Sequence, residues 1–214
     1  MMKQNTITYT LLLAASIGLL SCHKLTRSIH DTLDGNSKEI ADNNSISQVS
    51  EISRKNKDLD FMADRESLQE AENLLRNRPE LKGKEIRIYQ TIHFYTDYRI
   101  SLKIQNPDNP NYVDSYSYDD GIWKDPEPVV LSKSDDVTGN IVNLSQIPFV
   151  NANNTYKAMV AKMQEIGSKS TNRTVYATTY RNKVTWYPRS LSNERSRYSI
   201  EFNEDGTLRS FEQD

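Results

Sequence analysis

The sequence has little cysteine, glycine or proline, and it has no excess of charge of either sign. Its 214 residues include one cysteine, seven glycines and seven prolines. A single thiol excludes an internal disulfide, so the fold has to be stable through packing alone. The basic Lys and Arg side chains number 27 and the acidic ones 29. A balance so close to neutral does not indicate nucleic-acid binding.

Recognisable catalytic and metal-binding patterns are also missing from the sequence. No glycines have the spacing of a phosphate-binding loop, and the three histidines are not clustered. His23 and His30 fall in a polar stretch near the N-terminus, and His93 falls on the polar side of an expected strand. We therefore predict no catalytic residue, no cofactor and no metal ligand, and a protein that is not an enzyme. The alternative is an envelope hydrolase that acts on glycan or peptide through two of the 29 acidic groups.

Long hydrophobic runs are absent except for one near the N-terminus. A basic Lys3 and a polar stretch precede the apolar residues 11–20, and Ser21 follows them. As a helix this run would rise about 15 Å, roughly half of the hydrocarbon thickness of a bilayer. It is thus too short for a permanent membrane span and has the layout of a secretory signal. We predict a signal peptide over residues 1–21.

The only cysteine stands directly after this signal. Leu19, Leu20, Ser21 and Cys22 together resemble the lipobox of bacterial lipoproteins, although Leu20 is a less typical residue at its position. The resemblance implies cleavage before Cys22 and attachment of diacylglycerol to its sulfur, usually with a further acyl chain on the new amino group. Several acyl chains are enough for stable anchoring in a membrane. We therefore expect a lipid-anchored protein of the cell envelope, on the periplasmic face of the outer membrane, rather than an ordinary signal with an incidental cysteine.

The stretch after the cysteine is poor in residues that can form a core. Residues 23–60 contain no Phe, Trp or Tyr and are rich in Ser, Asn, Asp and Lys. Such a composition does not bury enough apolar surface to offset the entropy of ordering the chain. We predict a disordered, flexible tether over residues 22–60, with a root-mean-square span of about 35 Å.

A helix followed by strands is predicted for residues 61–131. Asp64 is expected to cap a helix whose apolar side chains lie on one stripe over residues 68–75. Residues 86–94 and 98–105 then alternate between apolar and polar types, which is typical of half-buried strands. A turn is predicted at Asp119, Asp120 and Gly121, with one more strand after it.

The same order of elements is predicted again over residues 153–214, after a connection over residues 132–152. In this connection Ile141 and Val142 are candidates for an edge strand. Asn153 or Asn154 is expected to cap a helix that ends near Gly167. Four strands are predicted after this helix: residues 174–180, 184–187, 198–203 and, after a turn at 204–206, a last strand that holds Leu208 and Phe211.

The predicted fold is therefore α+β, with two tandem helix-plus-antiparallel-meander units behind a disordered tether. The element order and the two Asp-Gly turns, at residues 120–121 and 205–206, resemble the PepSY-like and β-lactamase-inhibitor-like folds. Lipoproteins with this organisation are frequent in Bacteroidota. A likeness of this kind implies a fold and assigns no functional residue.

Aromatic side chains on the strands are the remaining candidates for function. Tyr89 and Tyr95 fall on the face expected to meet solvent, and Trp186 and Tyr187 are adjacent and so point to opposite faces. Exposed aromatics on a sheet bind sugars or a protein partner, whereas cross-strand pairing or burial under a helix is the structural alternative. We predict a non-enzymatic binding or accessory module with an envelope protein or glycan as partner. An inhibitor-type or immunity-type protein is a third reading, suggested by the fold likeness alone.

Overall fold

The structure, a computed structural model, describes residues 60–214, and all of these belong to one compact unit of the chain. It has an α+β fold with two α-helices and mostly antiparallel strands. The predictions made for the signal peptide, for Cys22 and for the tether up to residue 59 lie outside the described residues. Within residues 60–214, no helix is both long enough and apolar enough to cross a membrane.

The described part begins with a 3-10 turn, η1 (Phe61–Ala63), which leads into helix α3 (Arg65–Arg76). The carboxylate of Asp64 accepts hydrogen bonds from the backbone N–H groups of Glu66 and Ser67, both at 3.1 Å, so the predicted N-cap is confirmed. Because Leu68, Ala71 and Leu75 recur at helical spacing, α3 buries one stripe of apolar side chains.

Four strands follow as an antiparallel meander: β1 (Arg87–Phe94), β2 (Arg99–Gln105), β3 (Val113–Asp119) and β4 (Ile122–Trp123). The short strand β5 (Glu127–Pro128) pairs with the other end of β3, on the same edge as β4. The predicted Asp-Gly turn is confirmed, because Asp120 and Gly121 both adopt positive φ values between β3 and β4. An irregularity in β1 places Gln90 at φ 59° and shifts the register between Ile88 and Ile92.

The connection between the two halves of the chain contains three short elements: the 3-10 turn η2 (Thr138–Asn140), the strand β6 (Ile141–Asn143) and the 3-10 turn η3 (Leu144–Gln146). β6 pairs with the first half of β1, so the predicted edge strand is confirmed. Helix α4 (Val150–Glu165) comes next, and Gly167 follows it at φ 65°, as predicted for a helix end.

The start predicted for α4 at Asn153 or Asn154 is wrong. The helix begins at Val150, directly after Pro148, and Phe149 occupies the N-cap position. The side chain of Asn153 is buried and its amide donates to the carbonyl oxygen of Met62 at 2.7 Å. Asparagine favours helix caps, but this one makes a tertiary contact between α4 and η1.

The last five strands are β7 (Val175–Tyr180), β8 (Lys183–Tyr187), β9 (Ser190–Ser192), β10 (Arg197–Phe202) and β11 (Leu208–Gln213). β7 pairs antiparallel with the second half of β1, which gives an eight-stranded sheet with the main order β4-β3-β2-β1-β7-β8. The remaining three form a small sheet in the order β11-β10-β9. Strands of the two halves therefore share one large sheet.

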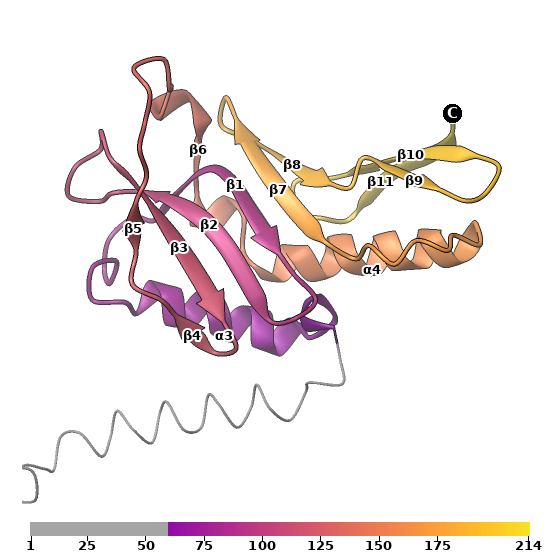
Figure 1. Cartoon of the computed structure of the whole chain (residues 1–214), viewed down its shortest axis with the longest axis horizontal. Coiled ribbons are helices and arrows are strands. Elements are labelled where there is room, and N and C mark those ends of the chain that lie inside the picture. The colour runs from indigo at the N-terminus through magenta and orange to yellow at the C-terminus, as the bar shows by residue number, and fades with distance from the viewer. Residues whose placement is uncertain (1–59) are drawn as a thin grey trace, which may run out of the picture. The chain divides into compact units, whose positions relative to one another are not determined.

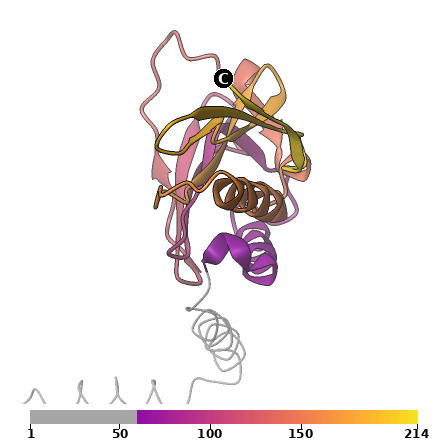
Figure 2. The same ribbon diagram turned by 90° about the vertical axis from the view of Figure 1, so that its right-hand side faces the viewer.

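Both helices lie side by side on one side of the strands (Figures 1 and 2). The inner face, by which we mean the face of the large sheet turned toward α3 and α4, carries the main core. Its members alternate along each strand, as a pleated sheet requires. They include Ile88, Ile92 and Phe94 on β1, Ile100, Leu102 and Ile104 on β2, Tyr116 and Tyr118 on β3, and Val175, Ala177 and Trp186 on β7 and β8.

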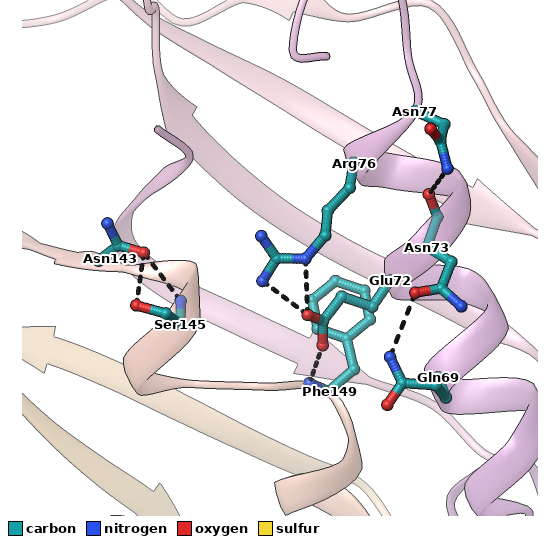
Figure 3. A network of polar contacts seen from close by, with 8 residues as sticks. All are labelled: Gln69, Glu72, Asn73, Arg76, Asn77, Asn143, Ser145 and Phe149. Carbon is teal, nitrogen blue, oxygen red and sulfur yellow. Dashed lines mark hydrogen bonds and ion pairs between the residues drawn. The ribbon is translucent and has the colours of Figure 1, made fainter. Parts of the chain in front are cut away.

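Buried polar side chains connect the layers on this side. Glu72 of α3 is buried; one of its oxygens accepts from the backbone N–H of Phe149 at 2.8 Å, and the other is 2.9 Å from Nε of Arg76 (Figure 3). Trp123 Nε1 donates to the carbonyl oxygen of Ala71, and Trp186 Nε1 donates to that of Glu204. These contacts satisfy polar atoms that would otherwise be costly to bury.

Candidate binding surface

The outer face of the large sheet, turned away from the two helices, is polar. Its side chains follow from the same alternation, because they lie next to residues that point to the inner face. They are His93 on β1, Ser101 and Lys103 on β2, Ser115 and Ser117 on β3, Tyr176 and Thr178 on β7, and Thr185 and Tyr187 on β8.

Four half-buried rings on this face form a line that we call the aromatic row: Tyr95, His93, Tyr176 and Tyr187. Tyr176 and Tyr187 are cross-strand partners with ring centroids 4.4 Å apart and planes within 6°. His93 and Tyr176 are also cross-strand partners, 5.0 Å apart and within 15°. Tyr95 continues the row at 6.3 Å from His93. The row therefore joins β1 from the first half of the chain to β7 and β8 from the second.

The central ring of the row, that of Tyr176, shows its edge to solvent rather than its faces. β7 lies between β1 and β8, so both faces of Tyr176 are covered, one by His93 and the other by Tyr187. The phenol hydroxyls of Tyr95, Tyr176 and Tyr187 make no hydrogen bond to any other described residue. This surface therefore offers three phenol hydroxyls that have no partner among the described residues.

Two basic side chains, Arg99 and Lys103, lie beside the aromatic row. The guanidinium carbon of Arg99 lies 4.7 Å from the ring centroid of Tyr95. Burial lowers the pKa of His93, and the nearby positive charge of Lys103 lowers it further. Burial also raises the pKa of Tyr176, with a smaller contribution from Tyr187. At neutral pH the imidazole of His93 is therefore neutral and the phenol of Tyr176 keeps its proton.

The prediction of an accessible binding surface is wrong for two of its four residues, Tyr89 and Trp186. Tyr89 is 1% exposed and Trp186 is 1% exposed, so neither contributes to an accessible surface. Trp186 points to the inner face, where it stacks on Phe94. Tyr89 lies outside the main core, where Asp135 and Asp136 of the connection are close enough to raise the pKa of its phenol, which burial already raises.

The structure brings the other two predicted residues together and adds two that were missed. Tyr95 and Tyr187 are half-buried and stand at the ends of the aromatic row. His93 was interpreted as an ordinary half-exposed residue, and Tyr176 was not singled out at all. The signal that identifies both is register: once β1 pairs with β7, His93 and Tyr176 are direct neighbours.

A second candidate is a hollow at one end of the large sheet, with a volume of about 370 Å³. It is lined by Thr96, Asp97, Tyr98, Asp119 and Asp120. Burial and the carboxylate of Asp64 raise the pKa of Tyr98 to about 12, so that this phenol stays protonated. Within residues 60–214 no group of three His, Cys, Asp or Glu side chains is arranged to hold a metal ion.

The arginines of and next to the small sheet include several that are engaged with acidic neighbours. Arg189 lies 2.6 Å from Glu201, and Arg197 lies 3.4 Å from Asp214. Exposed pairs of this kind contribute little to stability. They also leave less free positive charge on the small sheet than its arginine content indicates.

No protein-family model, curated protein or solved structure matches the chain significantly.

Proposed function

We propose that this chain is a lipid-anchored binding or accessory module of the cell envelope, not an enzyme, and that it binds its partner through the outer face of the large sheet. The observation that carries the binding part is the aromatic row. It is half-exposed, no helix covers it, and its hydroxyls have no partner among the described residues. The anchor part rests on the sequence of residues 1–22.

The anchor is tested by metabolic labelling. Cells that express the chain are fed a radioactive fatty acid, and the purified protein is examined for label. The expected result is labelling of the native chain and none of Cys22→Ser, because the thioether forms on that sulfur. Label that persists in the variant would contradict lipidation at this residue.

The binding surface is tested by cross-linking of the full chain in envelope preparations. Tyr176→Ala with Tyr187→Ala removes two rings from the row, whereas Lys157→Ala changes an exposed residue of α4, on the other side of the sheet. We expect a cross-linked partner, protein or glycan, that the double variant loses and the Lys157 variant keeps. A partner that both variants retain would place the binding site elsewhere.

We propose also that the two halves are tandem units of the PepSY-like type, over residues 61–131 and 153–214. Each half has one α-helix followed by antiparallel strands, and each has a glycine at positive φ, Gly121 or Gly206, in a turn between two paired strands. The pairing of β1 with β7 joins the first strand of one half to the first strand of the other. Independent folding of either half would support this division.

An inhibitor-type protein is the second candidate. The observation in its favour is that strands from both halves contribute to one sheet, which gives a broad surface for a partner. This candidate predicts that the cross-linked partner is an enzyme whose activity falls when the chain binds. A partner without enzymatic activity, or an enzyme whose activity is unaffected by binding, would contradict the inhibitor role and support the accessory role.

A further inference from the structure

We propose that the aromatic row and the polar side chains beside it bind an anionic polysaccharide, carboxylated or sulfated. This inference rests on the proposed function, because it names the ligand of the same outer face. Its three supports are the orientation of the rings, the regular array of donors across the strands, and the charge around them.

The orientation of the rings determines which contacts they make with a sugar. A platform for a neutral sugar presents the face of an aromatic ring. Here Tyr176 has His93 on one face and Tyr187 on the other, at centroid distances of 5.0 and 4.4 Å. At Tyr176 only the ring edge is left for a ligand, and along the row the accessible polar groups are phenol hydroxyls and an imidazole. These groups donate hydrogen bonds, and the strongest acceptors for them are charged oxygens.

The donors lie in one line across five neighbouring strands. The paired residues are Ser117 with Ser101, Ser101 with His93, His93 with Tyr176, and Tyr176 with Tyr187. Strands in a sheet are about 4.8 Å apart, so the line is about 19 Å long. A linear polymer that lies across the strands meets a donor at each of them. A single small anion would use one or two of the five.

Charges of both signs flank this line: Arg99, Lys103 and Lys183 are positive, and Asp119 and Glu127 are the cross-strand partners of Arg99 and Ser115. Neither Lys103 nor Lys183 forms an ion pair with any residue among 60–214, and Lys103 is close enough to His93 to influence its pKa. Arg99 stacks on Tyr95, and among the described residues it forms an ion pair with the exposed carboxylate of Asp97. An anionic ligand supplies a partner for Lys103 and Lys183.

A protein partner fits this surface less well. Protein interfaces depend on a few anchors, mainly Trp, Tyr and Arg, that enter pockets on the partner, whereas Tyr176 is held between His93 and Tyr187. Large apolar side chains that are well exposed could also serve as anchors. On the described part of the chain such exposed side chains stand in loops or at the ends of hairpins, away from the middle of the row. They are Tyr112, Ile122, Val130 and Tyr180.

The test is calorimetric titration of the full chain in detergent with four polymers. Dextran sulfate and polygalacturonate are the anionic polysaccharides, dextran is the neutral counterpart of the first, and polyglutamate is an anionic polymer without sugar. We expect both anionic polysaccharides to bind and dextran not to bind. Polyglutamate is expected to bind at least about tenfold more weakly, because it lacks the sugar hydroxyls that the row also contacts.

Three variants locate the site. Lys103→Gln is expected to reduce the affinity for dextran sulfate about tenfold, since a charge-assisted hydrogen bond is lost. Tyr176→Phe, which removes one hydroxyl and keeps the stacking, is expected to reduce it about threefold. Lys157→Gln on α4 removes the same charge from the opposite side and is expected to have no effect. Thermal unfolding of each variant checks that the fold is intact.

Each outcome decides between the proposals. Absence of binding to either anionic polysaccharide overturns this inference, as does equal binding of dextran or of polyglutamate. Equal loss in Lys103→Gln and Lys157→Gln also overturns it, because it indicates attraction to charge in general. If the polysaccharides fail but the cross-linked partner still depends on Tyr176 and Tyr187, the binding function stands with another ligand. If both fail, the outer face is not a binding surface.

Discussion

Aromatic side chains lie on both faces of the large sheet, but they are arranged in different ways. On the inner face Phe94 meets Phe149 edge-on at 5.5 Å and Trp186 in a stack at 6.3 Å. On the outer face His93, Tyr176 and Tyr187 are nearly parallel and follow the strand spacing. The inner rings fill a volume between layers, whereas the outer rings repeat along one direction of the surface.

The polar atoms of the aromatic side chains also differ between the two faces in their hydrogen bonding. The indole nitrogens of Trp123 and Trp186 on the inner side donate to backbone carbonyl oxygens. The hydroxyls of Tyr95, Tyr176 and Tyr187 on the outer side make no such bond within the described chain. An internal aromatic with a polar group needs a partner in the protein. A surface aromatic does not, and its polar group stays available to solvent or to a ligand.

The largest expected effect is from truncation on the inner face. Phe94 is fully buried, so Phe94→Ala is expected to lower the free energy of unfolding by about 3–5 kcal/mol. Denaturant unfolding followed by far-UV circular dichroism measures it. A loss below about 1 kcal/mol would mean that the inner cluster is not the main source of stability.

Gly206 tests whether close backbone contact between the β10–β11 turn and α4 also contributes to stability. It has φ 79°, and a Cβ at this residue would lie 2.3 Å from the carbonyl oxygen of Asn151 on α4. We expect Gly206→Ala to cost about 2–3 kcal/mol, from the clash together with the positive φ.

Gly83 is the matched control, with φ 76° and nothing within 4 Å of its Cβ position. Gly83→Ala is therefore expected to cost only the backbone strain, about 1 kcal/mol. The same unfolding measurement is made on both variants. Equal losses would show that the β10–β11 turn is not tightly seated on α4.

A smaller effect is expected from truncation on the outer face. Tyr176→Ala removes a half-buried ring and its cross-strand contacts, which are worth about 1 kcal/mol or less. We expect this variant to unfold near the native midpoint while it loses the cross-linked partner. A loss comparable to that of Phe94→Ala would instead assign the aromatic row a structural role.

The smallest effect is a dependence of stability on pH that comes from His93. Burial and Lys103 lower its pKa in the folded state below the ordinary 6.5, so the fold favours the neutral ring. Its contribution is present above pH 6.5 and is lost as the pH falls through the folded-state pKa, because the unfolded chain then binds the extra proton.

Substitution of the ring isolates this contribution. Unfolding free energies of the native chain and of His93→Gln are compared between pH 5 and pH 8. The native chain is expected to lose more stability than the variant at the acid end. Parallel curves would show that His93 carries no such contribution.

Much of the fold was predictable because the patterns within each element are local. The cap at Asp64, the alternation in 98–105 and the turn at Gly121 depend on neighbours within a few residues, and all three are confirmed. The start of α4 was not predictable from caps, since Asn153 is used to contact Met62. That contact depends on how α4 and η1 meet, which no local pattern encodes.

The candidate site was half predictable for the same reason. Alternation places Tyr95 and Tyr187 on accessible faces, but it does not say which other segment covers a face. Tyr89 was expected to meet solvent, and it is buried close to Asp135 and Asp136 of the connection. The partnership of His93 with Tyr176 arises from pairing between distant strands, so it became visible only with the register.

The way β1 is paired has a consequence for the making of the chain. One edge of β1 is divided between β6 and β7, and β7 comes only after the connection and α4. A chain that ends or is cut before Val175 therefore has Ile92 and Phe94 beside an open row of backbone donors and acceptors. Such an edge recruits strands from other molecules. An incomplete or nicked product is thus expected to aggregate, so chain completion itself protects this protein.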